Sequence, residues 1–198
     1  MRQETGSNLT IDNKKVSIQV KLGGLSFSAT EEYAAENAEV VEIVVDTPRV
    51  ILAPREAVSL DTADALLQLA GKSCQNGEQS ACSELQNEIV AIMAINSNAL
   101  ATAIKKWGSR ATFLSPLLDM RHNNENCLTI DASERVCYIR HFDNGLQYAE
   151  AMEYTSAEDI LYYTSVRADV NNNIPIYIKG CPKAAKLLRK YYKRVICE

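Results

Sequence analysis

The chain has 198 residues, of which 46% are hydrophobic and 23% charged, proportions typical of a soluble globular protein and not of a disordered one. A net charge of −4 gives the chain as a whole no electrostatic reason to bind nucleic acid or an anionic membrane. No apolar run approaches the ~20 residues of a membrane helix, and the first residues carry no signal-peptide pattern, so we predict a cytoplasmic protein without a membrane partner.

The first predicted element is a strand over residues 16–21, where valine and isoleucine alternate with polar residues. Gly23 and Gly24 follow as a hairpin turn, because glycine adopts positive φ without steric cost. Two further strands are predicted over 40–45 and 50–53, separated by a turn that contains a proline.

The rest of the first half alternates helix and strand. The pattern predicts a helix over 61–69, a polar and mobile segment over 72–83 and a buried strand over 89–95. A second helix is predicted to start at a Ser97 cap and run to Trp107, followed by an extended piece over 111–115.

The second half has a clearer pattern of three strands in succession, at 127–131, 135–141 and 146–154. In the last strand we expect Leu146 and Tyr148 on one face and Ala149 on the other.

A helix capped by Ser156 and Asp159 should follow these strands and run to about residue 170. The chain then continues as a strand over 174–178, a turn at Gly180 and a final helix with Pro182 in its first turn.

A less regular version of the second half's three-strand pattern occurs in residues 16–53. This repeat indicates a duplicated α/β domain with a cleft between its halves. The order strand, helix, strand favours right-handed crossovers onto a mixed sheet. We therefore predict a disordered tail over 1–14, a first lobe over 15–115 and a second lobe over 116–198.

Six cysteines are present, and none forms a Cys-x-x-Cys pair, so no zinc site is predicted. Cys127 and Cys137 lie in apolar strand patterns typical of buried free thiols. Cys74 and Cys82 lie together in the polar segment, where we expect reduced thiols in a mobile loop.

Asp131 ends the first strand of the second half, where phosphotransfer folds place an acid that coordinates magnesium beside glycines that bind phosphate. Here Ala132 and Ser133 follow instead of glycines. In the first half Gly23 and Gly24 supply a turn without an acid before it. Each half therefore carries part of a phosphate-loop pattern. We favour the simpler interpretation that both segments are ordinary turns.

The two histidines, His122 and His141, have no cysteine or acid at metal-ligand spacing, and the sequence contains no nucleophile elbow. We interpret both as surface residues and predict no catalytic residue and no metal.

The final helix carries a basic stripe with spacings of 3, 4 and 3, formed by Lys183, Lys186, Lys190 and Lys193. Such a stripe can bind an anionic partner such as a phosphate backbone, or it can be a solvated face. We favour the solvated face, because no aromatic side chains for base stacking share the stripe.

Five segments resemble an uncharacterised bacterial family, domain of unknown function 3822, in their order and spacing over most of residues 15–195: VSIQVKLGGLSFS, VILAPREAV, EIVAIMAINSNALATAIKKW, YTSAEDILYY and IPIYIKG. That family is similar to the actin, Hsp70 and sugar-kinase superfamily, whose lobes are built on ribonuclease H-like sheets. The resemblance implies an α/β fold of two actin-like ATPase lobes, each a mixed sheet with three consecutive antiparallel strands and crossover helices.

The resemblance also implies where a nucleotide would bind. The superfamily's two phosphate loops fall on residues 21–25 and 131–134, and its adenosine turn falls on 180–182. Gly23, Gly24, Asp131 and Gly180 match this pattern, whereas the first acid, the second-loop glycines and the second adenosine glycine are missing. We therefore predict no bound cofactor.

From these observations we expect a non-catalytic, actin-like binding or scaffolding protein with a degenerate nucleotide cleft and a protein partner. Two alternatives stay open. One is an ATPase or small-molecule kinase with atypical phosphate loops, and the other is nucleic-acid binding through the basic final helix.

Overall fold

The structure is a computed structural model, and it describes residues 15–21, 24–25, 35, 37–59, 61–84, 88–169 and 173–198. The predicted tail and the turn residue Gly23 lie outside these residues. No helix within the described ranges is long and apolar enough to cross a membrane.

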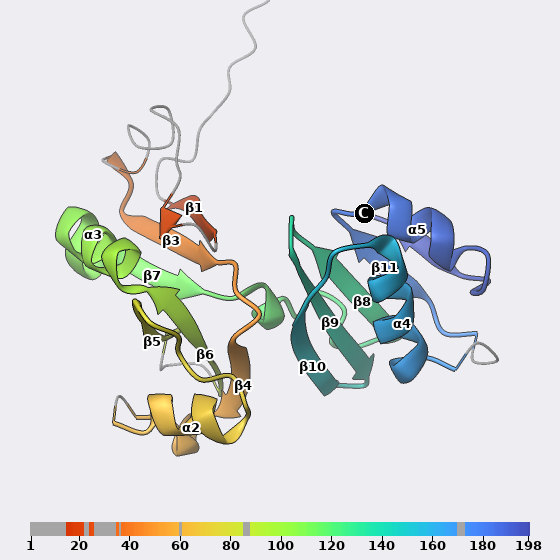
Figure 1. The fold of residues 1–198 in the computed structure, drawn as a ribbon, viewed down its shortest axis with the longest axis horizontal. Coiled ribbons are helices and arrows are strands. Elements are labelled where there is room, and N and C mark those ends of the chain that lie inside the picture. Colours follow the sequence, from red (N-terminus) through yellow and green to blue (C-terminus); the bar gives the residue numbers. More distant parts are fainter. Residues whose placement is uncertain are drawn as a thin grey trace, which may run out of the picture.

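The first half (residues 15–115) contains two sheets (Figure 1). One has the order β2-β1-β3-β7, with β1 (Lys15–Lys21), β2 (Gly24–Leu25), β3 (Val40–Val45) and β7 (Ala111–Leu114). The other is antiparallel with the order β4-β6-β5, formed by β4 (Val50–Pro54), β5 (Glu78–Cys82) and β6 (Ile89–Asn96).

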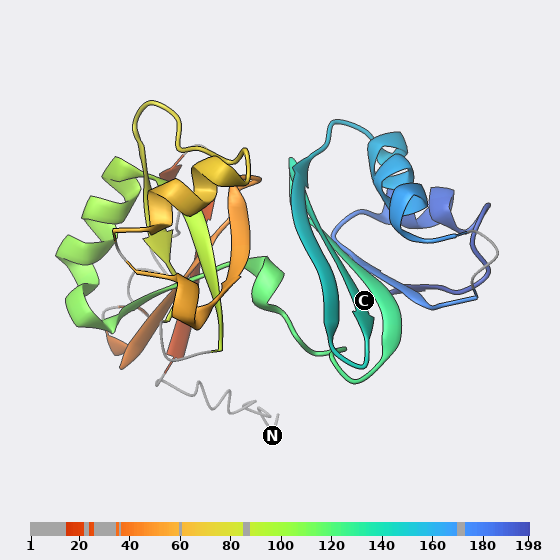
Figure 2. The same ribbon diagram turned by 90° about the horizontal axis from the view of Figure 1, so that it is seen from below.

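The second half (residues 116–198) forms one five-stranded sheet with the order β10-β9-β8-β11-β12. Its strands are β8 (Asn126–Ala132), β9 (Val136–Asp143), β10 (Leu146–Glu153), β11 (Ile176–Lys179) and β12 (Val195–Cys197). The first three strands are antiparallel, as the sequence predicts. Helices α4 (Ala157–Arg167) and α5 (Pro182–Leu188) lead into β11 and β12, which add parallel to β8. Figure 2 shows both helices on the sheet face that points away from the first half.

Local sequence signals explain where the helices begin. Helix α2 (Ala63–Leu69) lies within the predicted range. Helix α3 (Ser97–Trp107) begins one residue earlier than expected, because Asn96 rather than Ser97 caps it and accepts hydrogen bonds from two backbone N–H groups. The predicted capping box of α4 is confirmed, with Ser156 and Asp159 each accepting from the other's backbone.

The main hydrophobic core continues from the first half into the second. It joins residues of β1, β3, β6 and α3 to Leu117, Val136, Tyr138 and Ala151. A second core lies between the five-stranded sheet and helices α4 and α5. The sheet of the second half is therefore covered on both faces, which explains why side chains on both faces of β9 are buried.

Three expectations about local structure are wrong. The segment predicted to be mobile, 72–83, contains β5, which pairs with β6 along its whole length. The final helix ends at Leu188, so a four-lysine helical stripe does not form. An irregularity in β10 pairs Leu146 with Phe142 and Tyr148 with His141, so Leu146 and Tyr148 lie on opposite faces.

Tyr148 and Ala149 face opposite sides as predicted, since they pack against different cores. The predicted duplication is not confirmed. In the sheet β2-β1-β3-β7, only β2 and β1 pair antiparallel among the described residues, and β3 and β7 add parallel to β1.

Candidate functional site

A cleft of about 510 Å³ lies where the two halves meet. It is lined from the first half by Gln19, Val44 and Asp46, from the connection by Pro116 and Asp119, and from the second half by residues 131–134, Tyr138, Lys179 and Gly180. The lining includes four acids and one lysine, so the cleft is acidic.

Two of the predicted cofactor-binding residues, Asp131 and Gly180, come together in this cleft. Gly24 is not among the described lining residues; it pairs with Lys21 in the β1–β2 hairpin.

Gly180 has a φ of +85°, and a Cβ placed there would lie 1.8 Å from the carbonyl oxygen of Ala132. Glycine is therefore required because the turn after β11 touches the backbone of the β8–β9 turn.

Asp46 connects the two halves across the cleft. Its Oδ1 accepts hydrogen bonds from the Tyr138 hydroxyl at 2.7 Å and from Ser133 Oγ at 2.9 Å. The same hydroxyl accepts from the backbone N–H of Thr47 at 2.9 Å. Burial, together with the neighbouring Asp46 carboxylate, raises the pKa of Tyr138, so the hydroxyl stays protonated and donates.

The sequence analysis missed Asp46, which it placed in a turn. A signal was present, because an acid directly after a buried strand such as β3 stands at the strand's carboxyl end, where sites gather in α/β sheets.

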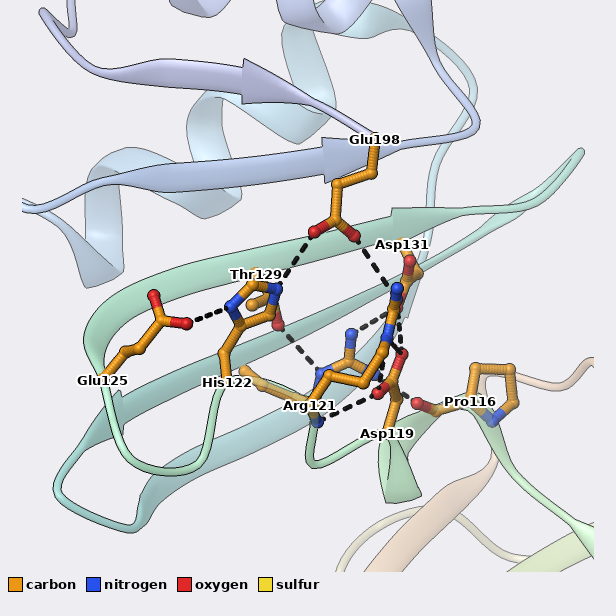
Figure 3. A network of polar contacts seen from close by, with 9 residues as sticks. Pro116, Asp119, Arg121, His122, Glu125, Thr129, Asp131 and Glu198 are labelled. Atoms are coloured by element: carbon orange, nitrogen blue, oxygen red, sulfur yellow. Dashed lines mark hydrogen bonds and ion pairs between the residues drawn. The ribbon is translucent and has the colours of Figure 1, made fainter.

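Asp131 forms an ion pair with Arg140, whose side chain is only 2% exposed. Arg140 also donates from Nε to Thr129 Oγ1 at 2.9 Å and from Nη1 to the carbonyl of Pro116 (Figure 3). Asp131, one of the predicted cofactor-binding residues, is thus engaged by a buried cation that also holds the connection between the halves.

A second polar group surrounds His122, on the loop before β8. Its Nδ1 lies 2.9 Å from Glu125 Oε1 and its Nε2 lies 3.0 Å from Glu198 Oε1 (Figure 3). Its ring stacks on Tyr177, with ring centroids 4.1 Å apart. Burial lowers the pKa of His122, but these hydrogen bonds outweigh burial and leave it above the usual value. The prediction that His122 is an ordinary surface residue is wrong.

Arg121 extends this group toward the cleft. It pairs with Asp119 at 2.7 Å and with Glu198 at 3.3 Å. Burial raises the pKa of Asp119, but the bonds from Arg121 outweigh it and hold that pKa below its ordinary value.

The predicted anionic-partner lysines are divided by the end of α5. Lys183 and Lys186 lie on the helix, and Lys190 lies just beyond it. These three line one groove together with residues 154–158, whereas Lys193 is not among the described lining residues.

No family model matches the sequence, and a search of curated proteins finds no significant match. Among solved structures, a Bacteroides thetaiotaomicron protein described as having an actin-like ATPase fold and unknown function superposes with a TM-score of 0.72 at 16% identity, over 94% of this chain and 91% of that one.

Two other structures give lower TM-scores. They are the cytoplasmic domain of EpsL from Vibrio cholerae (0.44, 10% identity, 83% and 81% coverage) and the AlfA filament bound to AMPPNP (0.40, 13% identity, 85% and 57% coverage). Membership in domain of unknown function 3822 is not confirmed. The chain has the actin-like ATPase fold, with mixed α/β sheets.

Proposed function

We propose that this chain is a non-catalytic binding or scaffolding protein of the actin-like fold, with lobes 15–115 and 116–198 fixed by contacts between its own side chains. The observation that carries the proposal is the position of Asp46, whose carboxylate accepts from Ser133 and Tyr138 across the cleft. Ser133 belongs to the loop that the family resemblance assigns to phosphate.

A nucleotide phosphate at this loop would have to displace the Asp46 carboxylate or lie beside it. Asp46 is only 5% exposed, and like charges repel most strongly where water is excluded. The Ser133 hydroxyl also donates to Asp46, so it is engaged already. A protein carboxylate is therefore already bonded to the loop to which the resemblance assigns phosphate, which supports a non-catalytic role.

Magnesium binding at Asp131 meets a similar obstacle. The carboxylate pairs with the buried Arg140 guanidinium, and separating such a pair leaves an uncompensated buried charge. A second cation beside Arg140 would add repulsion.

Contacts elsewhere between the halves favour a rigid molecule over one that opens and closes around a substrate. The core is continuous from β3 and β6 into β9 and β10. Lys72 Nζ donates to the carbonyl of Ala151 in the second half at 2.7 Å and to that of Pro48 in the first at 3.0 Å. A fixed two-lobed surface suits a protein that positions a partner.

The decisive experiment is isothermal titration of the full chain with Mg-ATP, Mg-GTP and Mg-ADP, combined with hydrogen exchange of the Thr47 amide. We expect no saturable heat, and equal protection of that amide with and without nucleotide. A one-site isotherm that Asp131→Asn abolishes would overturn the proposal, because this variant keeps an oxygen for Arg140 and removes only the charge that magnesium needs.

An atypical ATPase or small-molecule kinase is the second candidate. The meeting of Asp131, Ser133 and Gly180 in one cleft supports it. In that case Asp46→Ala, which frees the Ser133 hydroxyl and removes a negative charge, should strengthen Mg-ATP binding. No gain in this variant argues against the candidate.

Nucleic-acid binding is supported by the groove shared by Lys183, Lys186 and Lys190. Gel-shift assays at low salt test it, because phosphate contacts weaken steeply as salt rises. Retardation that Lys186→Gln reduces would favour this role, and free migration of both DNA and RNA at low salt would exclude it.

A further inference from the structure

Three side chains with different metal-binding atoms meet at the start of the second-half sheet. The Nδ1 or Nε2 of His122, a carboxylate oxygen of Glu125 and the Sγ of Cys127 lie within 4.8 Å of one another. Imidazole nitrogen, carboxylate oxygen and thiolate sulfur are the three kinds of ligand that zinc binds.

The local backbone explains why these residues converge. The backbone N–H of Glu125 donates to the carbonyl of His122 at 3.0 Å, which closes a turn and brings residues 122 and 125 side by side. Cys127 is the second residue of β8, directly after this turn, and its side chain is buried. The ligands therefore come from a six-residue segment, His-x-x-Glu-x-Cys, that one turn folds together. The sequence analysis, which found no acid or cysteine at ligand spacing from His122, missed this group.

Neighbouring residues orient two of the three ligands. The second ring nitrogen of His122, Nε2, lies 3.0 Å from Glu198 Oε1, and Arg121 holds the other oxygen of Glu198 at 3.3 Å. The Tyr177 hydroxyl donates to Glu125 Oε2 at 3.0 Å, and its ring stacks on His122. A carboxylate on the far nitrogen of a histidine is the usual support for a metal ligand, because it fixes the tautomer and the ring orientation.

We propose that His122 Nδ1, Glu125 and Cys127 bind a zinc-class divalent transition-metal ion. On binding, the proton between His122 Nδ1 and Glu125 and the Cys127 thiol proton leave to solvent, while Nε2–H donates to Glu198. The two anionic ligands then balance the charge of the ion. Glu125 keeps 45% of its side chain exposed, which leaves a route for the ion and a position for water.

The Cys127 thiol has to lose its proton to bind an ion. Burial, with the Glu125 charge as a lesser cause, raises the pKa of Cys127 to about 11, so the thiol stays protonated without an ion. A bound metal ion reverses this balance and deprotonates a coordinating thiol. Glu198 is a positioning residue in this site, since it acts through His122.

The test is a titration of the full chain with Co²⁺ alone, kept reduced, followed by displacement with Zn²⁺. We expect one equivalent of Co²⁺ to give a thiolate-to-cobalt charge-transfer band that one equivalent of Zn²⁺ removes. The band should be lost in Cys127→Ala, and Co²⁺ affinity should fall at least tenfold in His122→Gln. Glu198→Gln should weaken binding by about 10–100-fold, as for other supporting residues.

The chain supplies matched controls for the His122 and Cys127 variants. His141→Gln removes the other histidine, and Cys137→Ala removes the other fully buried strand thiol, which faces the opposite core. Both should keep the band. His122 lies on a loop and its side chain is partly exposed, so His122→Gln stays informative even if Cys127→Ala fails to fold.

Absence of the band in the wild-type chain at excess Co²⁺ would overturn the proposal. So would a band that persists in Cys127→Ala, or wild-type affinity in folded His122→Gln.

Discussion

The Tyr138 hydroxyl lies 2.7 Å from Asp46 Oδ1, and this bond crosses from the second-half sheet to the end of β3 in the first half. Ninety-two residues separate the two in sequence. Both side chains are buried, at 1% and 5% exposure, so the bond is shielded from competing water. It fixes the Asp46 carboxylate that also accepts from Ser133, and so it links the turn after β8 to the contact between the halves.

Tyr138→Phe should lower the free energy of unfolding by about 1–3 kcal/mol. The ring volume stays, but the Thr47 amide loses its acceptor and Asp46 loses one donor. Urea unfolding followed by circular dichroism measures the change. The control is Tyr162→Phe, whose ring is 65% exposed on α4 and which should change stability by less than about 0.5 kcal/mol. Equal stability of the two variants would mean that the Asp46–Tyr138 contact contributes nothing.

Gly180→Ala should destabilise the chain far more than Gly71→Ala. Both glycines have positive φ, +85° and +70°, so both substitutions carry about 1–2 kcal/mol of left-handed strain. Only at Gly180 would the new Cβ meet the backbone of Ala132, whereas nothing lies within 4 Å of a Cβ at Gly71. The difference in melting temperature between the Gly180→Ala and Gly71→Ala variants measures the effect of the steric clash alone. A difference near zero would show that the turn after β11 does not touch the β8–β9 turn.

Glu78→Gln should reduce both stability at neutral pH and the sensitivity of the fold to acid. Burial raises the pKa of Glu78, but hydrogen bonds from Arg49 and the Gln75 amide outweigh it and leave the pKa below its usual value of 4.5. Because the folded pKa is lower than the unfolded one, the stabilisation is present above pH 4.5 and lost as the pH falls through the folded value.

Urea unfolding at neutral pH and at a series of acidic pH values checks this. The variant should lose about 1–3 kcal/mol at neutral pH and show a flatter decline in acid. Glu84→Gln, on an exposed carboxyl, is the control that should keep the wild-type pH profile. An unchanged acid profile in Glu78→Gln would contradict the assigned role of the Arg49–Glu78 pair.

Ile130→Ala and Ile139→Ala should each cost about 2–5 kcal/mol, the range for large-to-small changes in a packed core. Both side chains are at most 1% exposed in the core under α4 and α5. Ile104→Ala, on a side chain that is 52% exposed, should have a small effect. If all three variants have the same melting temperature, Ile130 of β8 and Ile139 of β9 do not face this core.

The strands and helices were largely predictable because their signals are local. Alternating residues give β1, the Ser156–Asp159 box begins α4, and Pro182 opens α5. Errors arose where local signals compete with pairing. β5 has a polar sequence and forms a strand because its backbone pairs with the edge of β6. In β10, one irregular residue moves Leu146 to the opposite face of the sheet from Tyr148.

The sequence by itself determined most of the elements, the antiparallel order of β8 to β10 and the position of Asp131 and Gly180 at strand ends. Only the tertiary structure decided the chemistry around them. Asp46 meets Ser133 across 87 residues, and His122 meets Glu198 across 76, because separate sheets and chain segments pack there. Hydrogen-bond partners at such separations depend on how whole helices and strands pack against one another. The spacing of residues along the chain does not predict that packing.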